Sequence, residues 1–147
     1  MADTESARAT PSRNLRLLSE EELAQRRPIL LAGIGQFNDG YFFQAHETLE
    51  ELWLVSPLPT RTFLQGIIQT AAAFVHMRRR EHKGTVRLLG HALAKLETFP
   101  GEYMGIDVAR LVDDVRAAHD ELLVLDPERF EEWDNVPAIH LLDVANV

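Results

Sequence analysis

Apolar side chains recur at intervals of three and four along most of this chain, which is the spacing of one face of an α-helix. The first such stretch opens at Ser19, which forms the sequence pattern of a capping box with Glu22. Pro28 interrupts this stretch. Because proline lacks an N–H and disfavours helix at the residue before it, we expect a kink or a restart near Arg27. The turn-forming sequence Asn-Asp-Gly at residues 38–40 predicts the end of this helix.

Two more helices are predicted before the middle of the chain. One covers about residues 41–55 and ends at the Pro-Leu-Pro sequence of residues 57–59. Trp53 falls on its apolar face, so we expect it in the core. The next helix covers about residues 60–80, with Thr60 as the expected N-cap. Its middle is apolar on more than one side, which predicts a buried, central helix.

The second half of the chain predicts two further helices and an extended end. A turn at Gly84 precedes a fourth helix over about residues 85–99, and a fifth helix with an acidic outer face covers about residues 106–123. The final residues, 134–147, hold short apolar pieces around Pro137 and predict an extended strap that packs over the bundle. No segment shows the strong alternation of apolar and polar residues that is typical of a strand.

These elements predict one domain. Residues 1–18 are polar and rich in small residues, so we expect a disordered arm. Residues 19–147 are enough to bury a core without added cross-links. Helices joined by short loops are usually antiparallel neighbours. The fold predicted is therefore all-α: a compact bundle of about five helices in antiparallel hairpins, with a disordered N-terminal arm and an extended C-terminal strap.

Composition and charge exclude several classes of protein. The chain has no cysteine, so disulfides, thiolate metal sites and cysteine nucleophiles are excluded. Its formal net charge of -8 argues against nucleic-acid binding, which needs a basic surface. There is no run of about 18 apolar residues and no apolar signal segment at the start, so we expect a cytoplasmic protein with no membrane partner. A basic cluster at residues 78–87 and an acidic segment at residues 107–134 are interpreted as solvated faces.

Several polar residues fall on or beside the apolar faces of the second and third predicted helices. His46 and Glu50 are four residues apart, so they share one side of their helix. Gln65, Gln69 and His76 share a face of the next helix at intervals of four and seven. Because these two helices are expected to pack as antiparallel neighbours, we expect the five side chains to meet inside the bundle.

Such a cluster has two interpretations. Burying many polar groups is costly unless they bond to one another or to a ligand. In the first interpretation they form a structural network, in which Glu50 or Gln69 accepts a hydrogen bond from His46. In the second, His46, Glu50 and His76 bind a metal ion, because helical bundles build ion sites from such side chains. The zinc motif H-E-x-x-H is absent, since Glu50 stands at its second histidine position.

Two blocks of sequence resemble a known family. Residues 37–53 read FNDGYFFQAHETLEELW, and residues 61–73 read RTFLQGIIQTAAA; His76, Arg80 and Gly84 follow. This pattern resembles the family called domain of unknown function 309, over about residues 34–96. The resemblance implies a compact helical bundle, in agreement with the periodicity.

Members of that family are often labelled predicted metal-dependent hydrolases. The resemblance therefore implies a divalent metal at His46, Glu50 and His76. In the hypothesis of a metal-dependent hydrolase, the catalytic carboxylates are Glu47 and Glu50. The residues expected to bind substrate in this hypothesis are Arg61, Gln65, Gln69 and Arg80.

The alternative function is a non-catalytic protein-interaction module, in which the same polar residues form a structural network. A third hypothesis is an anion sensor that uses Arg61 or Arg80. The expected partner is accordingly a small molecule or a protein. A cavity beside His46 and Glu50 would favour a ligand site, whereas a sealed pair would favour the structural network.

Overall fold

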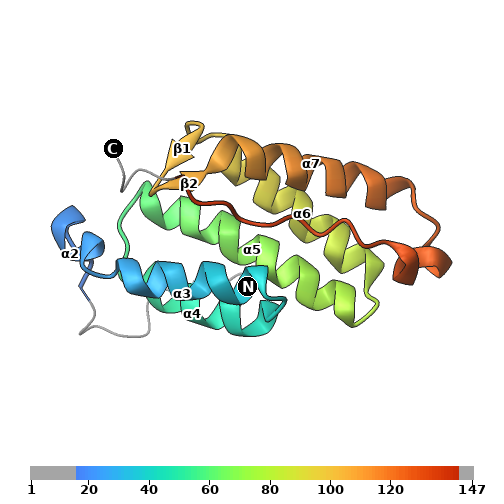
Figure 1. The fold of residues 1–147 in the computed structure, drawn as a ribbon, viewed down its shortest axis with the longest axis horizontal. Coiled ribbons are helices and arrows are strands. Elements are labelled where there is room, and N and C mark those ends of the chain that lie inside the picture. The colour runs from blue at the N-terminus through green and yellow to red at the C-terminus, as the bar shows by residue number, and fades with distance from the viewer. Residues whose placement is uncertain (1–15, 143–147) are drawn as a thin grey trace.

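A computed structural model describes residues 16–142 of the protein, and helices dominate this part of the chain (Figure 1). Five long helices form the body, as the periodicity predicts, so the all-α bundle is confirmed. These elements are α2 (Glu20–Ala24), α3 (Arg27–Asn38), α4 (Phe42–Leu54), α5 (Thr60–Arg78), α6 (His82–Leu96), β1 (Glu102–Tyr103), β2 (Ile106–Asp107), α7 (Val108–Val124) and the 3₁₀ helix η1 (Pro127–Glu132).

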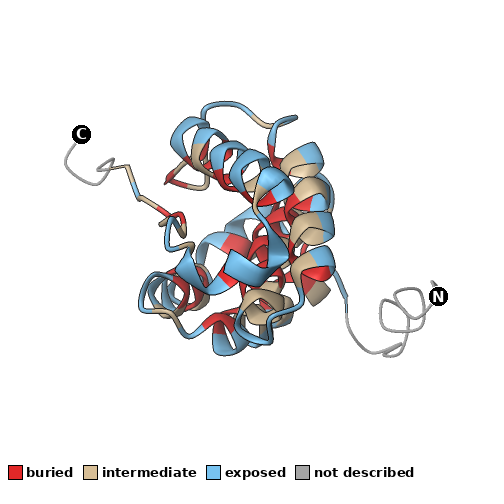
Figure 2. Ribbon diagram, turned by 90° about the vertical axis from the view of Figure 1, so that its right-hand side faces the viewer, coloured by how far each residue is buried: buried red, intermediate tan, exposed pale blue. Residues whose placement is uncertain are grey.

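The long helix α5 lies in the middle of the bundle (Figure 1). It packs against α4 on one side and α6 on the other, while α3 packs on α4 and α7 packs on α6. Short turns join α3 to α4 and α5 to α6, so these neighbours are antiparallel hairpins. Figure 2 shows how the buried residues gather on the facing sides of the helices.

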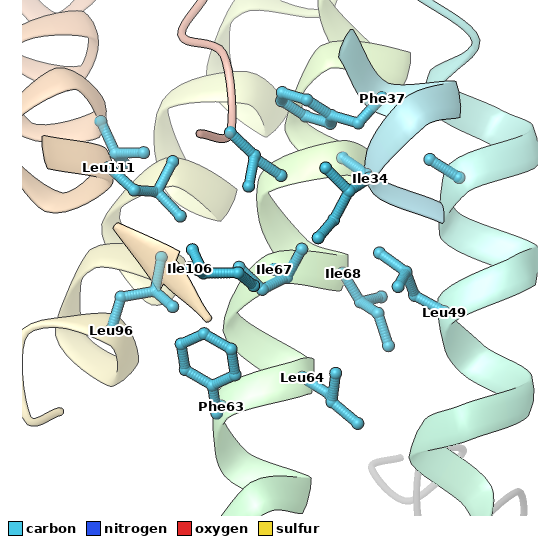
Figure 3. Close-up of a cluster of buried hydrophobic side chains, with 14 of the residues drawn as sticks. Ile34, Phe37, Leu49, Phe63, Leu64, Ile67, Ile68, Leu96, Ile106 and Leu111 are labelled. Carbon is cyan, nitrogen blue, oxygen red and sulfur yellow. The ribbon is translucent and has the colours of Figure 1, made fainter. Parts of the chain in front are cut away.

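Side chains of α5 form the centre of the hydrophobic core. Phe63, Leu64 and Ile67 are completely buried and meet residues from α3, α4, α6 and α7 (Figure 3). Ile106, which comes from β2, packs into the same cluster. The prediction of a central, buried helix is therefore confirmed. Within residues 16–142, none of the helices combines the length and the apolar character needed to cross a membrane.

The first predicted helix is divided in two, as Pro28 indicates. The Ser19 side chain accepts from the Glu22 N–H and the Glu22 carboxylate accepts from the Ser19 N–H, so the capping box that opens α2 is confirmed. Pro28 lies in the first turn of α3, where a missing N–H leaves no helical hydrogen bond unmade. The restart near Arg27 is therefore confirmed.

Two expected helix starts are wrong. Thr60 does not cap α5, because its hydroxyl bonds to the Tyr103 hydroxyl at 2.8 Å and Pro59 stands at the cap position. Gly84 is not in a turn, because α6 already begins at His82. The glycine is buried in the first turn of α6, where a Cβ would lie 2.8 Å from His76 Nδ1. Close packing between α5 and α6, and not turn formation, requires glycine here.

A short β-hairpin precedes α7 and was not predicted. Tyr103 pairs with Ile106, and the two residues between them, Met104 and Gly105, have φ values of 55° and 78°. Both values lie in the left-handed region, as a tight two-residue turn requires. Strands of two residues are too short for an alternating pattern, so periodicity could not reveal them.

The predicted C-terminal strap is present over residues 134–142, and residues 143–147 lie outside the described chain. It runs extended across the bundle (Figure 1). The Asp107 N–H donates to the His140 carbonyl at 2.9 Å, and the Leu142 N–H donates to the Gly105 carbonyl at 2.8 Å. The strap is further tied by Asn38, whose side chain accepts from the Ile139 N–H at 2.8 Å and donates to the Ile139 carbonyl at 2.9 Å.

The predicted arm, residues 1–18, falls mostly outside the described chain, which begins at Arg16. Its last residues are part of the folded domain. Leu18 is buried, and its N–H donates to the Val55 carbonyl at 2.8 Å. The predicted boundary at residue 18 therefore lies too late in the sequence.

Candidate functional site

The first half of α4 sets one wall of a cleft. Phe42, Ala45 and Leu49 are buried and fix which side of α4 faces the core. His46 directly follows Ala45, and Glu50 directly follows Leu49. Both side chains are therefore partly buried at the edge of that side. The prediction that this pair lies beside the core is confirmed by the placement of these two side chains.

The facing wall comes from α5. Gln65 and Gln69 are partly buried on the side of α5 that meets α4, and α6 closes one end of the cleft with Leu88. The cleft has a volume of about 210 Å³. Its lining comprises His46, Glu50, Trp53, Gln65, Ile68, Gln69, Ala72 and Leu88. Four of the five polar residues expected to meet are therefore brought together, with open space between them.

Three polar atoms of this lining have no hydrogen-bond partner within the described chain. They are Nδ1 of His46, Nε1 of Trp53 and Oε1 of Gln69, and each is buried. A buried polar group without a partner costs about 1–3 kcal/mol. The N–H of Trp53 is a donor, and the Oε1 of Gln69 is an acceptor. The side chains that line the cleft therefore include both kinds of unpaired hydrogen-bonding group.

Trp53 is the site residue that sequence reasoning assigned only to the core. Its side chain is indeed 8% exposed, yet its indole N–H is left unpaired in the cleft. The sequence spacing indicates that Trp53 belongs with the polar pair. Intervals of four and three place His46, Glu50 and Trp53 on one face of the helix. An indole carries a polar N–H on an apolar body, so a core position does not exclude a site role.

Arg61 contacts Trp53 and is not part of the cleft lining. Its guanidinium carbon is 3.9 Å from the centre of the Trp53 ring, and its Nη1 donates to the Trp53 carbonyl at 3.3 Å. Burial lowers the pKa of the Arg61 guanidinium. Arg61 does not line the cleft, and its role in substrate binding stays a prediction.

His76 does not line the cleft that holds His46 and Glu50. It lines a neighbouring hollow of about 160 Å³ together with His46 and Phe43, and the Phe43 ring stacks parallel to His46 with 6.4 Å between centroids. Nδ1 of His76 is paired with the Glu81 carboxylate. His76 thus shares a hollow with His46 and does not line the cleft that holds Glu50.

The metal implied by the resemblance does not fit the predicted ligands as the fold places them. Across residues 16–142, no three His, Asp or Glu side chains are grouped closely enough to hold one ion. A catalytic metal generally takes three protein ligands, whereas the cleft offers His46 and Glu50. The geometry therefore does not favour metal binding by His46, Glu50 and His76, and measurement with added metal in solution tests this hypothesis.

Two further predicted residues lie away from the cleft. Glu47 is exposed on the outer side of α4 and is not part of the cleft lining. Arg80 is exposed in the turn between α5 and α6, and it forms an ion pair with Glu131. Its φ of 61° shows that this residue makes the turn. Neither side chain is therefore part of the cleft lining.

Comparison with known proteins confirms the resemblance. A family model described as "Domain of unknown function (DUF309)" matches residues 30–88. This range contains every residue of the cleft lining, from His46 to Leu88. The chain is also similar to "Uncharacterized protein YpuF" from Bacillus subtilis (strain 168), with 32% identity over 84 residues. The match covers 55% of this chain and 48% of YpuF, so this chain spans about half the length of that relative. Neither description names an activity.

Proposed function

We propose that the stretch resembling the DUF309 family, residues 30–88, forms a binding site for a small polar molecule, with the cleft between α4 and α5 as its site. The observation that carries the proposal is the convergence of three unpaired buried polar atoms on one cleft, from His46, Trp53 and Gln69. A sealed structural network would pair these atoms with one another. Their open arrangement supports a ligand over the network of the interaction-module alternative.

The size of the cleft limits the ligand. Pockets for drug-sized ligands measure about 300–1,000 Å³. The cleft is smaller, at about 210 Å³, and Ile68, Ala72 and Leu88 give it an apolar side. The dimensions suit a molecule, or the end of a molecule, that places a few polar atoms against His46, Trp53 and Gln69.

A hydrolytic reaction is a second candidate function. It is favoured by one observation: the two ionisable side chains among the described residues of the cleft lining are His46 and Glu50, one helical turn apart. Histidine and carboxylate side chains are the usual proton carriers in general acid–base catalysis. In such a reaction one of them would take a proton from water and the other would protonate the leaving group. Glu50→Gln would then lose turnover and keep ligand binding.

The binding proposal is tested by thermal unfolding of purified protein with a panel of small amides, carboxylates, amines and ureas. A ligand at ten times its dissociation constant stabilises by about 1.4 kcal/mol, which corresponds to a rise in Tm of about 3–6 °C. We expect such a rise in the wild type and its loss in His46→Ala. His91→Ala is the matched control, because His91 is exposed on α6. A panel without effect on the wild type would overturn the proposal.

A further inference from the structure

The hydrogen-bonding groups of the cleft are arranged to accept a particular kind of ligand. Trp53 offers only a donor, because its indole has one N–H and no acceptor. Gln69 offers the acceptor Oε1. Glu50 adds a carboxylate to the same lining. His46 Nδ1 donates or accepts according to its tautomer. A fitting ligand therefore has a carbonyl-type acceptor and N–H donors within a few bonds of one another.

The charges beside the cleft disfavour ionic ligands. An anion would accept from the Trp53 N–H but would meet the Glu50 carboxylate and the Gln69 oxygen. Arg61 would not compensate, since its guanidinium lies on the Trp53 ring and outside the lining. A compact cation would satisfy Gln69 Oε1 but would leave the Trp53 N–H facing a positive charge. Binding of either an anion or a cation therefore leaves a buried polar atom of the cleft unpaired, which weakens binding.

Resting on the proposed function, we propose that the cleft binds a neutral carboxamide or ureido group. Its carbonyl oxygen accepts from the Trp53 N–H, and one of its N–H groups donates to Gln69 Oε1. The apolar residues Ile68, Ala72 and Leu88 lie beside the remainder of the ligand. One neutral group thus satisfies the Trp53 donor and the Gln69 acceptor at the same time, which neither ion does.

The two tryptophans of the chain provide a direct readout with an internal control. The Trp53 indole N–H is unpaired in the cleft, whereas the Trp133 indole N–H donates to Glu121 Oε1 at 2.8 Å. In ¹⁵N-labelled protein each indole gives its own NMR signal, and Trp53→Phe identifies which is which. Acetamide, acetate and methylammonium are the probes, since they are similar in size and differ in charge.

We expect acetamide to move the Trp53 indole signal along a saturable curve in the millimolar range, with the Trp133 signal unchanged. Acetate and methylammonium should move the Trp53 signal at least tenfold less at the same concentration. Movement of the Trp53 signal by an ion but not by acetamide would overturn the ligand class and leave the proposed function standing. Failure of all three probes to move it, together with a silent thermal panel, would overturn both.

A pair of glutamine variants tests the geometry. Gln69→Ala removes the acceptor, and the matched control Gln44→Ala removes an exposed glutamine from α4. We expect acetamide to bind Gln69→Ala about fivefold or more weakly, which is the effect of losing one hydrogen bond, and to bind Gln44→Ala as it binds the wild type. The Trp133 signal reports that each variant is folded. Unchanged acetamide binding in a folded Gln69→Ala would overturn the assigned contact.

Discussion

At the scale of single residues, a few polar atoms decide what the cleft can do. His46, Glu50, Gln65 and Gln69 were predicted from the sequence because the period of four places them on facing sides of two neighbouring helices. The position of His76 outside the cleft was not predictable, and its ring nitrogen bonds to Glu81, which lies beyond the end of α5. Periodicity gives the side of a helix that a residue occupies, but not the partner that its side chain selects.

The position of His76 outside the cleft leads to a prediction about metal ions. We expect the Tm of protein purified with EDTA to stay within about 1 °C when zinc or manganese is added, because the cleft supplies two ionisable ligands, His46 and Glu50. Thermal unfolding with and without each metal measures this. A larger rise that disappears in His46→Ala would contradict the expectation and support the metal-dependent hydrolase.

Glu22 provides a prediction on pH. The hydrogen bond from Arg16 and the hydrogen bond from the Ser19 N–H lower the pKa of Glu22 from 4.5 to about 2. A lowered pKa in the folded state means that the carboxylate stabilises the fold above the unfolded value and that this contribution disappears as the pH falls towards 2. The difference in Tm between wild type and Glu22→Gln should therefore be largest above pH 4.5 and shrink below it. A difference that is constant from pH 6 to pH 2 would refute the assignment.

At the scale of the elements, helices were predictable because each is long enough to show several repeats of its apolar face. The short hairpin of β1 and β2 was not, since each strand has two residues. Gly84 was assigned to a turn because glycine commonly ends helices. Its actual role is to let α6 approach His76 of α5, and the sequence alone does not distinguish a glycine that turns the chain from one that makes room for a neighbour.

Two glycines of α3 test close packing between α3 and α4. A Cβ at Gly33 would lie 2.5 Å from Leu49 Cδ2, whereas a Cβ at Gly35 would have no atom within 4 Å. We expect Gly33→Ala to lower the free energy of unfolding by about 1–3 kcal/mol through overpacking. Gly35→Ala should raise it by about 0.4–1 kcal/mol, because alanine favours the helix. Urea unfolding measures both, and equal effects would show that α3 does not pack on Leu49 as described.

At the scale of the whole molecule, contacts between distant parts of the chain hold the ends of the fold. The tie between Asn38 and Ile139 joins residues 101 positions apart. The contact between Asn38 and Ile139 could not be predicted, because the sequence indicates only a turn at Asn38 and the strap has no periodic pattern. The existence of the strap was predictable from the proline and the short apolar pieces of residues 134–147.

Loss of the Asn38 tie should loosen the strap. Asn38→Ala removes one acceptor and one donor, so we expect a loss of about 1–3 kcal/mol and faster hydrogen exchange at the Ile139 amide. Asn135→Ala is the control, since Asn135 is exposed on the same strap and bonds only to the exposed Glu121 among the described contacts. Equal exchange at Ile139 in both variants would contradict a tie through Asn38.

The central position of α5 has a consequence for how tightly the cleft can bind. Core residues surround most of this helix, from Phe63 to Phe74, and α4 is packed against both α3 and α5. A shift of either wall would disturb packed core residues, so we expect the backbone around the cleft to move little if a ligand binds. Binding then costs little conformational entropy, and the affinity is set by how many hydrogen bonds a molecule of this small size can make.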